Sequence, residues 1–190
     1  RMINLVNGLL NVSRIESGRL TLEPKLTDLV KLSKTVISEV NPIIKAHNQK
    51  LNFLASKDIP KVNIDPKLIS QVIANLLSNA SKYTPARGKI DFNIQVKDKD
   101  IIFTVKDNGM GIPQSQQNKI FEKFFRADNV VSTDTEGTGL GLYVAKAVVE
   151  ASGGNIGFNS TEKKGSTFWF RLPLSGSKGI KGEKSLEKIV

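Results

Sequence analysis

The chain has 190 residues and a mass of 20.8 kDa, enough for one full domain with an appendage or for two small domains. It contains no cysteine and a single histidine, which excludes disulfides, cysteine nucleophiles and a metal site with several histidines within the chain. Its net charge of +10 favours either a negatively charged partner or simply a basic, solvated surface. Because the first residue is Arg1, we interpret the sequence as a fragment of a longer protein.

The first predicted elements are two helices joined by an extended segment. Apolar residues recur at helical spacing over residues 1–17, and Gly18 follows them where a glycine favours helix termination. Residues 20–27 alternate leucines with other residues, which predicts an extended segment. Asp28 is a candidate N-cap for a second helix that ends near Asn48.

The middle of the chain combines one strong helix with short strands. Asp65 followed by Pro66 predicts a helix start, with the helix ending near Tyr83. Residues 51–55 and 62–64 are short strand candidates. Alternating apolar and polar residues predict two longer strands, joined as a hairpin, at 89–97 and 100–107.

The C-terminal third begins with a weak helix at 113–121 and a polar loop at 126–138. A helix is expected from Leu140 to about Ser152, followed by strands at 155–161 and 166–173. This order of elements predicts an α/β fold with one mixed sheet and helices on one face.

Three glycine-rich segments indicate contact with an anion. They are Asp107 to Ile112 after a strand, Gly137 to Leu142 before a helix, and Gly165 to Thr167 at the start of the last strand. Glycines at such positions let backbone amides approach a phosphate, and a helix N-terminus adds a favourable dipole. Ordinary turns are the alternative for any one segment taken alone.

A polar stripe lies on the helix that ends near Tyr83. Asn75, Asn79 and Lys82 are spaced at i, i+4 and i+7 and therefore share one face. An amide oxygen is sufficient as the protein ligand of a Mg²⁺ ion held mainly by phosphates and water. A polar outer face of the helix is the alternative interpretation.

Other nucleotide and nucleic-acid motifs are absent. No G-x-x-x-x-G-K-[ST] occurs, the second glycine segment follows a loop rather than a strand, and no H-R-D catalytic loop is present. Nucleic-acid binding is the simplest reading of the charge, but aromatic residues for base stacking are scarce, with two Tyr and one Trp. We therefore expect no nucleic-acid partner.

These segments together resemble the ATP-binding catalytic domain of bacterial sensor histidine kinases, in the wider group that includes gyrase, Hsp90 chaperones and MutL. The helix with Asn79 matches the N box of that family, 107–112 and 137–142 its two glycine boxes, and Phe121 to Arg126 its F box. The resemblance covers about residues 28–174. It implies a two-layer α/β sandwich of the Bergerat type, preceded by part of a helical hairpin.

The resemblance also implies roles for individual residues. Asn79 corresponds to the Mg²⁺ ligand, and Asp107 to the carboxylate that accepts a hydrogen bond from the adenine amino group. Residues 113–136 correspond to a lid over the phosphates. The residues expected to contact ATP are Asn75, Asn79, Lys82, Tyr83, Asp107, Gly109, Gly111, Ile112, Phe121, Arg126, Gly137, Thr138, Gly139, Leu140, Gly141, Leu142 and Thr167.

The recipient of the phosphoryl group is the part that the chain does not supply. Asn75 replaces the glutamate that acts as general base in hydrolytic relatives, so the resemblance implies slow hydrolysis and phosphoryl transfer. Residues 1–18 resemble the second helix of a dimerisation domain whose first helix carries the acceptor histidine. His47 lies far from any acceptor motif, and we interpret it as a surface residue.

The resemblance therefore predicts a cytoplasmic histidine kinase unit with no membrane contact of its own, although its parent could be membrane-anchored. Its expected partners are ATP or ADP, a dimerisation domain, a response-regulator receiver domain and, in the parent, a second copy. The expected units are 1–19 from the dimerisation domain, the ATP-binding domain at 20–174, and a flexible basic tail at 175–190. The alternatives are an anti-sigma-type serine kinase and a non-catalytic nucleotide-sensing scaffold.

Overall fold

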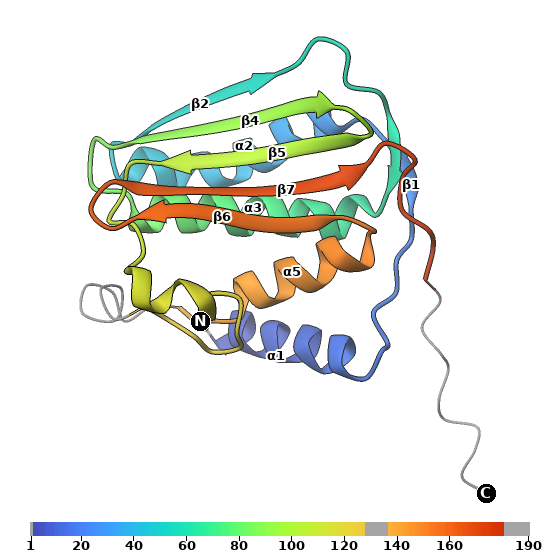
Figure 1. The fold of residues 1–190 in the computed structure, drawn as a ribbon, viewed down its shortest axis with the longest axis horizontal. Coiled ribbons are helices and arrows are strands. Elements are labelled where there is room, and N and C mark those ends of the chain that lie inside the picture. Colours follow the sequence, from blue (N-terminus) through green and yellow to red (C-terminus); the bar gives the residue numbers. More distant parts are fainter. Residues whose placement is uncertain (1, 128–136, 181–190) are drawn as a thin grey trace, which may run out of the picture.

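The computed structural model describes residues 2–127 and 137–180, with a five-stranded sheet at the centre of the molecule (Figure 1). Its strand order is β2-β4-β5-β7-β6, parallel between β2 and β4 and antiparallel elsewhere. The strands span, in that order, Lys50–Ala55, Lys89–Lys97, Asp100–Asp107, Gly165–Pro173 and Asn155–Thr161. The predicted mixed sheet is therefore confirmed.

Helices α2 (Leu29–Ala46), α3 (Pro66–Tyr83) and α5 (Gly141–Ala151) lie on one face of this sheet (Figure 1). The helix α1 (Met2–Glu16) packs against α5 rather than against the sheet. A short 3₁₀ helix, η1 (Gln114–Lys119), lies between β5 and α5 in the chain. The expectation of helices on one face is thus also confirmed.

Local sequence signals explain where the two long helices begin. The Asp28 carboxylate accepts a hydrogen bond from the Lys31 N–H at the start of α2. Asp65 Oδ1 accepts from the N–H groups of Lys67 and Leu68 at the start of α3, where Pro66 needs no partner. These caps satisfy amides that the first turn of a helix leaves unpaired.

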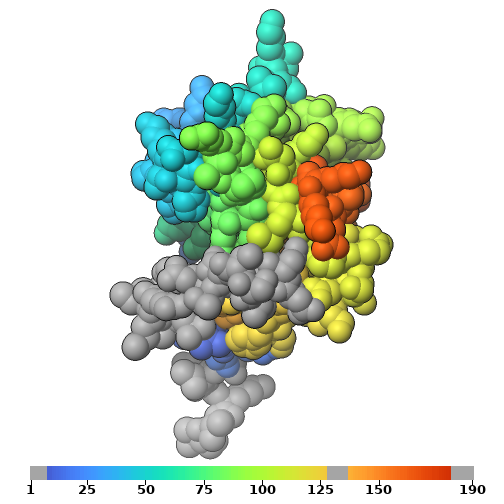
Figure 2. Space-filling model, turned by 90° about the vertical axis from the view of Figure 1, so that its left-hand side faces the viewer, coloured from blue at the N-terminus to red at the C-terminus, as the bar shows by residue number. Residues whose placement is uncertain are grey.

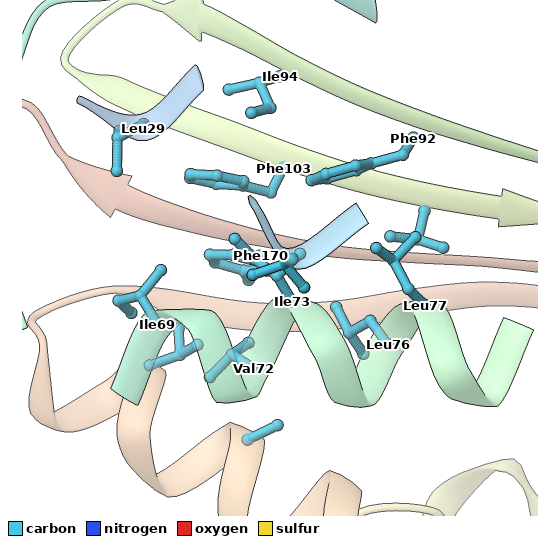
Figure 3. Close-up of a cluster of buried hydrophobic side chains, with 14 of the residues drawn as sticks. Leu29, Ile69, Val72, Ile73, Leu76, Leu77, Phe92, Ile94, Phe103 and Phe170 are labelled. Atoms are coloured by element: carbon cyan, nitrogen blue, oxygen red, sulfur yellow. The ribbon is translucent and has the colours of Figure 1, made fainter. Parts of the chain in front are cut away.

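The core fills the space between α3 and the sheet (Figure 3). Phe92, Phe103 and Phe170 are fully buried, and the rings of Phe103 and Phe170 are stacked with centroids 4.3 Å apart. The apolar stripe of α3 meets these rings, with Ile73 and Leu77 fully buried. This packing fixes α3 firmly against β5, and both elements carry candidate site residues.

The register of β5 determines where its last residue points. Ile101, Phe103 and Val105 are buried on the helix-covered face, and Asp107 follows at the same two-residue period. The carboxylate of Asp107 therefore emerges on the helix side, at the end of the sheet where α3 also ends.

Two features differ from the sequence-based expectations. The strand at 62–64 does not join the main sheet: it forms β3 (Val62–Ile64) of a separate two-stranded sheet with β1 (Lys25–Thr27). The expected tail from residue 175 begins with an attached segment, because Ser177 N–H donates to Asn63 O and Ile180 forms a β-bridge with Leu22. The remainder of that tail, from residue 181, lies outside the described residues.

None of the described helices combines the length and the apolar character needed to cross a lipid bilayer.

Candidate functional site

A cavity of about 250 Å³ opens at the end of the sheet where α3 ends and α5 begins. Its walls come from α3, the end of β5 with the loop that follows, the segment after η1, the start of α5, and β7. The residues that line it are Asn75, Asn79, Ala80, Lys82, Tyr83, Asp107, Gly111, Ile112, Ile120, Phe125, Arg126, Ala127, Gly137, Thr138, Gly139, Gly141, Leu142, Ser166 and Phe168.

Asp107 is the carboxylate at the base of this cavity, and only 6% of its surface is exposed. Its Oδ1 atom accepts hydrogen bonds from the N–H groups of Gly109, at 2.8 Å, and Ser166, at 3.2 Å. Burial raises the pKa of the Asp107 carboxyl, and these two backbone hydrogen bonds only partly oppose the rise. The Oδ2 atom is left as an acceptor for a donor inside the cavity.

The loop after Asp107 depends on close backbone approaches. A Cβ atom on Gly109 would lie 2.2 Å from Tyr83 O, and Gly111 has a φ of +65° with its Cα packed against the backbone of Thr161. The Met110 N–H donates to Tyr83 O at 3.1 Å, and the Ile112 N–H donates to Ser160 Oγ at 2.9 Å. The glycines therefore tie this loop to both α3 and β6.

The polar stripe predicted on α3 lines the opposite wall of the cavity. Asn79 Nδ2 donates to Asn75 Oδ1 at 3.5 Å, which leaves Asn79 Oδ1 as an acceptor. Asn75 Nδ2 is buried and has no hydrogen-bond partner among the described residues. The Lys82 ammonium lies 5.6 Å from the centroid of the Tyr83 ring. One cation and two carboxamides thus share this wall.

The second glycine segment leads into the N-terminus of α5. Gly141 is the first residue of α5, and a Cβ atom there would lie 2.3 Å from Asn75 Oδ1. Gly139 has a φ of +67° and packs against the backbone of Phe124. The N-cap residue Leu140 provides no side-chain cap, so the first N–H groups of α5 remain available beside the cavity.

Most of the predicted contact residues meet in this one cavity. They are Asn75, Asn79, Lys82, Tyr83, Asp107, Gly111, Ile112, Arg126, Gly137, Thr138, Gly139, Gly141 and Leu142. Four others do not line it, for different reasons. Gly109 lies just behind the wall and supports Asp107, whereas Leu140 is buried against Gly8 of α1. Phe121 packs against Phe158, and Thr167 lies on the other face of β7.

Thr167 does not lie on the face of β7 that lines the cavity, where its predicted contact with ATP would require it. Side chains alternate along a strand, so Ser166 faces the cavity while Thr167 lines a groove on the uncovered face of the sheet, beside Trp169. Ser166, not Thr167, also donates its N–H to Asp107. The sequence contained the necessary signal, because the alternation of buried residues in 166–173 separates the two positions.

Several apolar wall residues were not predicted as contacts, namely Ala80, Ile120, Phe125, Ala127 and Phe168. Phe125 lies in the segment that matches the F box, but neither it nor the other four was singled out as a contact. Ala80 and Phe168 are distinguished only by hydrophobicity, so the folded arrangement identifies them. Of the predicted lid at 113–136, residues 128–136 lie outside the described residues. Phe124 in the described part has a φ of +62° and is 59% exposed.

Substituting Asp107 by asparagine tests the electrostatics of the cavity without nucleotide. Asparagine retains the Oδ1 acceptor but not the buried charge. A carboxyl whose pKa is raised by folding stabilises the protein below its unfolded pKa of about 3.9 and loses that contribution as pH rises through the folded value. Asp107→Asn is therefore expected to gain stability relative to the wild type between acidic and neutral pH.

The check is urea unfolding of both proteins from pH 3.5 to pH 8, with Asp91→Asn as a control. The Asp91 pKa is lowered, chiefly by its hydrogen bond from Asn52, so that control should change in the opposite direction. A wild-type protein that becomes more stable than Asp107→Asn as pH rises would contradict the burial effect.

Comparison with known proteins matches residues 64–176 to the family described as histidine kinase-, DNA gyrase B-, and HSP90-like ATPases. The sensor histidine kinase WalK of Bacillus subtilis is 37% identical over 175 residues, which are 91% of this chain and 28% of that protein. The chain spans only 19–46% of the lengths of this and the other similar curated proteins.

Solved structures agree with this relationship. The catalytic domain of the histidine kinase ThkA is 30% identical, with a TM-score of 0.70 over 80% of this chain and 96% of that domain. ThkA in complex with the response regulator TrrA matches at 25% identity, a TM-score of 0.74, and 92% and 47% coverage. Full-length ShkA in complex with AMPPNP matches at 25% identity, a TM-score of 0.80, and 94% and 37% coverage. The chain therefore belongs to the histidine kinase-, DNA gyrase B- and HSP90-like ATPase family, among its histidine kinase catalytic domains.

Proposed function

We propose that this chain binds Mg²⁺·ATP in the cavity beside Asp107 and transfers the γ-phosphoryl group to a histidine on a dimerisation helix. The observation that supports this most directly is the Asp107 carboxylate, which is buried, lines the cavity and is oriented through Oδ1 by two backbone N–H groups. A fixed acceptor in that position distinguishes the amino group of adenine from the carbonyl of guanine, because two acceptors repel each other.

The adenine end of the cavity combines this acceptor with apolar walls. Ile112 and Phe168 line it and provide surface for the base. Gly109 and Gly111 keep the neighbouring backbone close, since neither position has space for a side chain. Base recognition by one polar contact between apolar walls is the usual composition of a small-molecule site.

The phosphate end has the donors that a triphosphate requires. Lys82 contributes a positive charge, and the N-terminus of α5 contributes unpaired N–H groups and the positive end of its dipole. Asn79 Oδ1 fits a single protein ligand of Mg²⁺, since Asn75 already engages its amide nitrogen. When bound, Mg²⁺ would neutralise charge on the transferring phosphoryl group.

The residues near the phosphate end favour transfer over hydrolysis. Asn75 is a neutral amide and cannot take a proton from water as a general base. Catalysis would then depend on holding ATP and excluding water until the acceptor arrives.

We assign residues 1–19 to the dimerisation domain and residues 20–174 to the ATP-binding domain, and we place both in the cytoplasm. Two contacts of α1 support an interface between these units: α1 packs against α5, and Glu16 of α1 forms an ion pair with Lys123 in the segment that follows η1.

The partners follow from the same assignment. A ThkA structure contains the response regulator TrrA, and by analogy we propose a receiver-domain aspartate as the next recipient of the phosphoryl group. ShkA was crystallised with AMPPNP, an ATP analogue, which supports the choice of nucleotide.

Asn79→Ala tests the metal role. We expect the affinity for ATP to fall about tenfold or more with Mg²⁺ present, equivalent to about 1.4 kcal/mol, and to change little in EDTA. Titration calorimetry in both buffers measures this, with Asn93→Ala on the uncovered sheet face as the matched control. Equal losses with and without Mg²⁺ would count against Asn79 as a metal ligand.

Phosphoryl transfer can be tested by supplying the acceptor separately. The chain is incubated with γ-labelled ATP and a separate two-helix dimerisation domain that carries an acceptor histidine. The expected product carries acid-labile label on the acceptor histidine, and none forms with Asp107→Asn. Acid-stable label on serine would favour the anti-sigma alternative, and binding of ATP without any transfer would favour a nucleotide-sensing scaffold.

A further inference from the structure

A buried glutamine lies directly beneath the last turn of α3, outside the cavity. Gln49 is the residue before β2, and only 7% of its surface is exposed. Its side-chain amide donates to Ser81 O at 2.8 Å and to Thr84 O at 2.6 Å. Its Oε1 accepts from Ser81 Oγ at 2.7 Å. Both donors and the carbonyl of this side chain are therefore paired.

These hydrogen bonds hold the C-terminal turn of α3, where the carbonyl groups have no partner within the helix. The last carbonyls of a helix have no intrahelical partner, and the final turn tends to fray. Figure 2 shows the blue-to-cyan segment around the start of β2 against the green segment at the end of α3. The two carbonyls that Gln49 engages bracket Lys82 and Tyr83.

Lys82 and Tyr83 both line the cavity beside Asp107. Lys82 is the cation that α3 contributes to the cavity wall. A Cβ atom placed on Gly137 would lie 3.0 Å from Lys82 Nζ. The Tyr83 carbonyl accepts the Met110 N–H and lies against Gly109, so it fixes the loop that follows Asp107. A small shift of this turn would move the cation and the adenine loop together.

We propose that Gln49 is a positioning residue for the nucleotide site. It clamps the C-terminal turn of α3 through Ser81 O and Thr84 O, and this clamp sets Lys82 and the Asp107–Ile112 loop in their ATP-binding positions. The proposal rests on the proposed function for its effect on ATP, whereas the clamp itself can be measured without nucleotide.

The test combines Gln49→Met, which keeps the length but removes both donors, with Ser81→Ala, which removes only the hydroxyl that orients the amide. Ser33→Ala is the matched control, since Ser33 is equally buried but lies on α2 and has no hydrogen bond to α3. For each protein, amide hydrogen exchange is measured by NMR without nucleotide, and the Kd for Mg²⁺·ATP is measured by calorimetry.

We expect Gln49→Met to weaken ATP binding about tenfold and Ser81→Ala about threefold, with Ser33→Ala unchanged, because buried carbonyls lose their donors or their orientation. Exchange at the Met110 amide should accelerate in the same order while the β4–β5 hairpin stays protected. The graded response of Ser81→Ala provides the result even if Gln49→Met does not fold.

Two outcomes would overturn the proposal. One is an unchanged Kd with unchanged Met110 exchange in a folded variant, and the other is a uniform loss of protection that includes the hairpin, which indicates general destabilisation. If the wild type fails to bind Mg²⁺·ATP while Met110 exchange still responds to the variants, the proposed function fails and the clamp on α3 stands.

Discussion

The site depends on one buried carboxylate whose position is set by backbone rather than by charge pairing. Asp107 ends a central strand, and two N–H groups, one from its own loop and one from β7, hold a single oxygen. Such a group is costly to bury, and the raised pKa records that cost. The core beneath β5 holds the end of the strand in place. We propose that the other carboxylate oxygen is thereby fixed as a selective acceptor.

Helix α3 links the core to both ends of the cavity. Its apolar stripe packs on Phe103 and Phe170, and its polar stripe presents two carboxamides and a lysine. Its last carbonyl, that of Tyr83, accepts the Met110 N–H and so holds the loop after β5. The start of α5 completes the opposite wall, where Gly141 leaves space for Asn75. A single helix therefore joins the core to the walls of the cavity, and for this reason we propose that a residue as remote as Gln49 affects ligand binding.

Much of this arrangement was predictable from the sequence, and the exceptions have physical causes. Helix caps, glycine positions and hydrophobic period are local signals, so the N-cap at Asp65, the close backbone approach at Gly111 and the shared polar face of α3 were predicted correctly. Non-local pairing was harder: residues 62–64 read as a strand, but nothing local shows that they pair with β1 instead of the main sheet. Thr167 was expected to contact ATP from the resemblance alone, whereas the alternation of side chains along β7 places it on the face opposite Ser166. Gln49 carries no motif, and only the folded structure reveals its partners.

The most direct test of this account is calorimetric titration of the chain with Mg²⁺·ATP and, separately, with Mg²⁺·GTP. The account predicts one saturable site for ATP and at least about tenfold weaker binding of GTP, a preference that Asp107→Asn reduces or abolishes. Equal affinity for the two nucleotides, or no saturable binding of ATP, would contradict the claim that the buried carboxylate selects adenine.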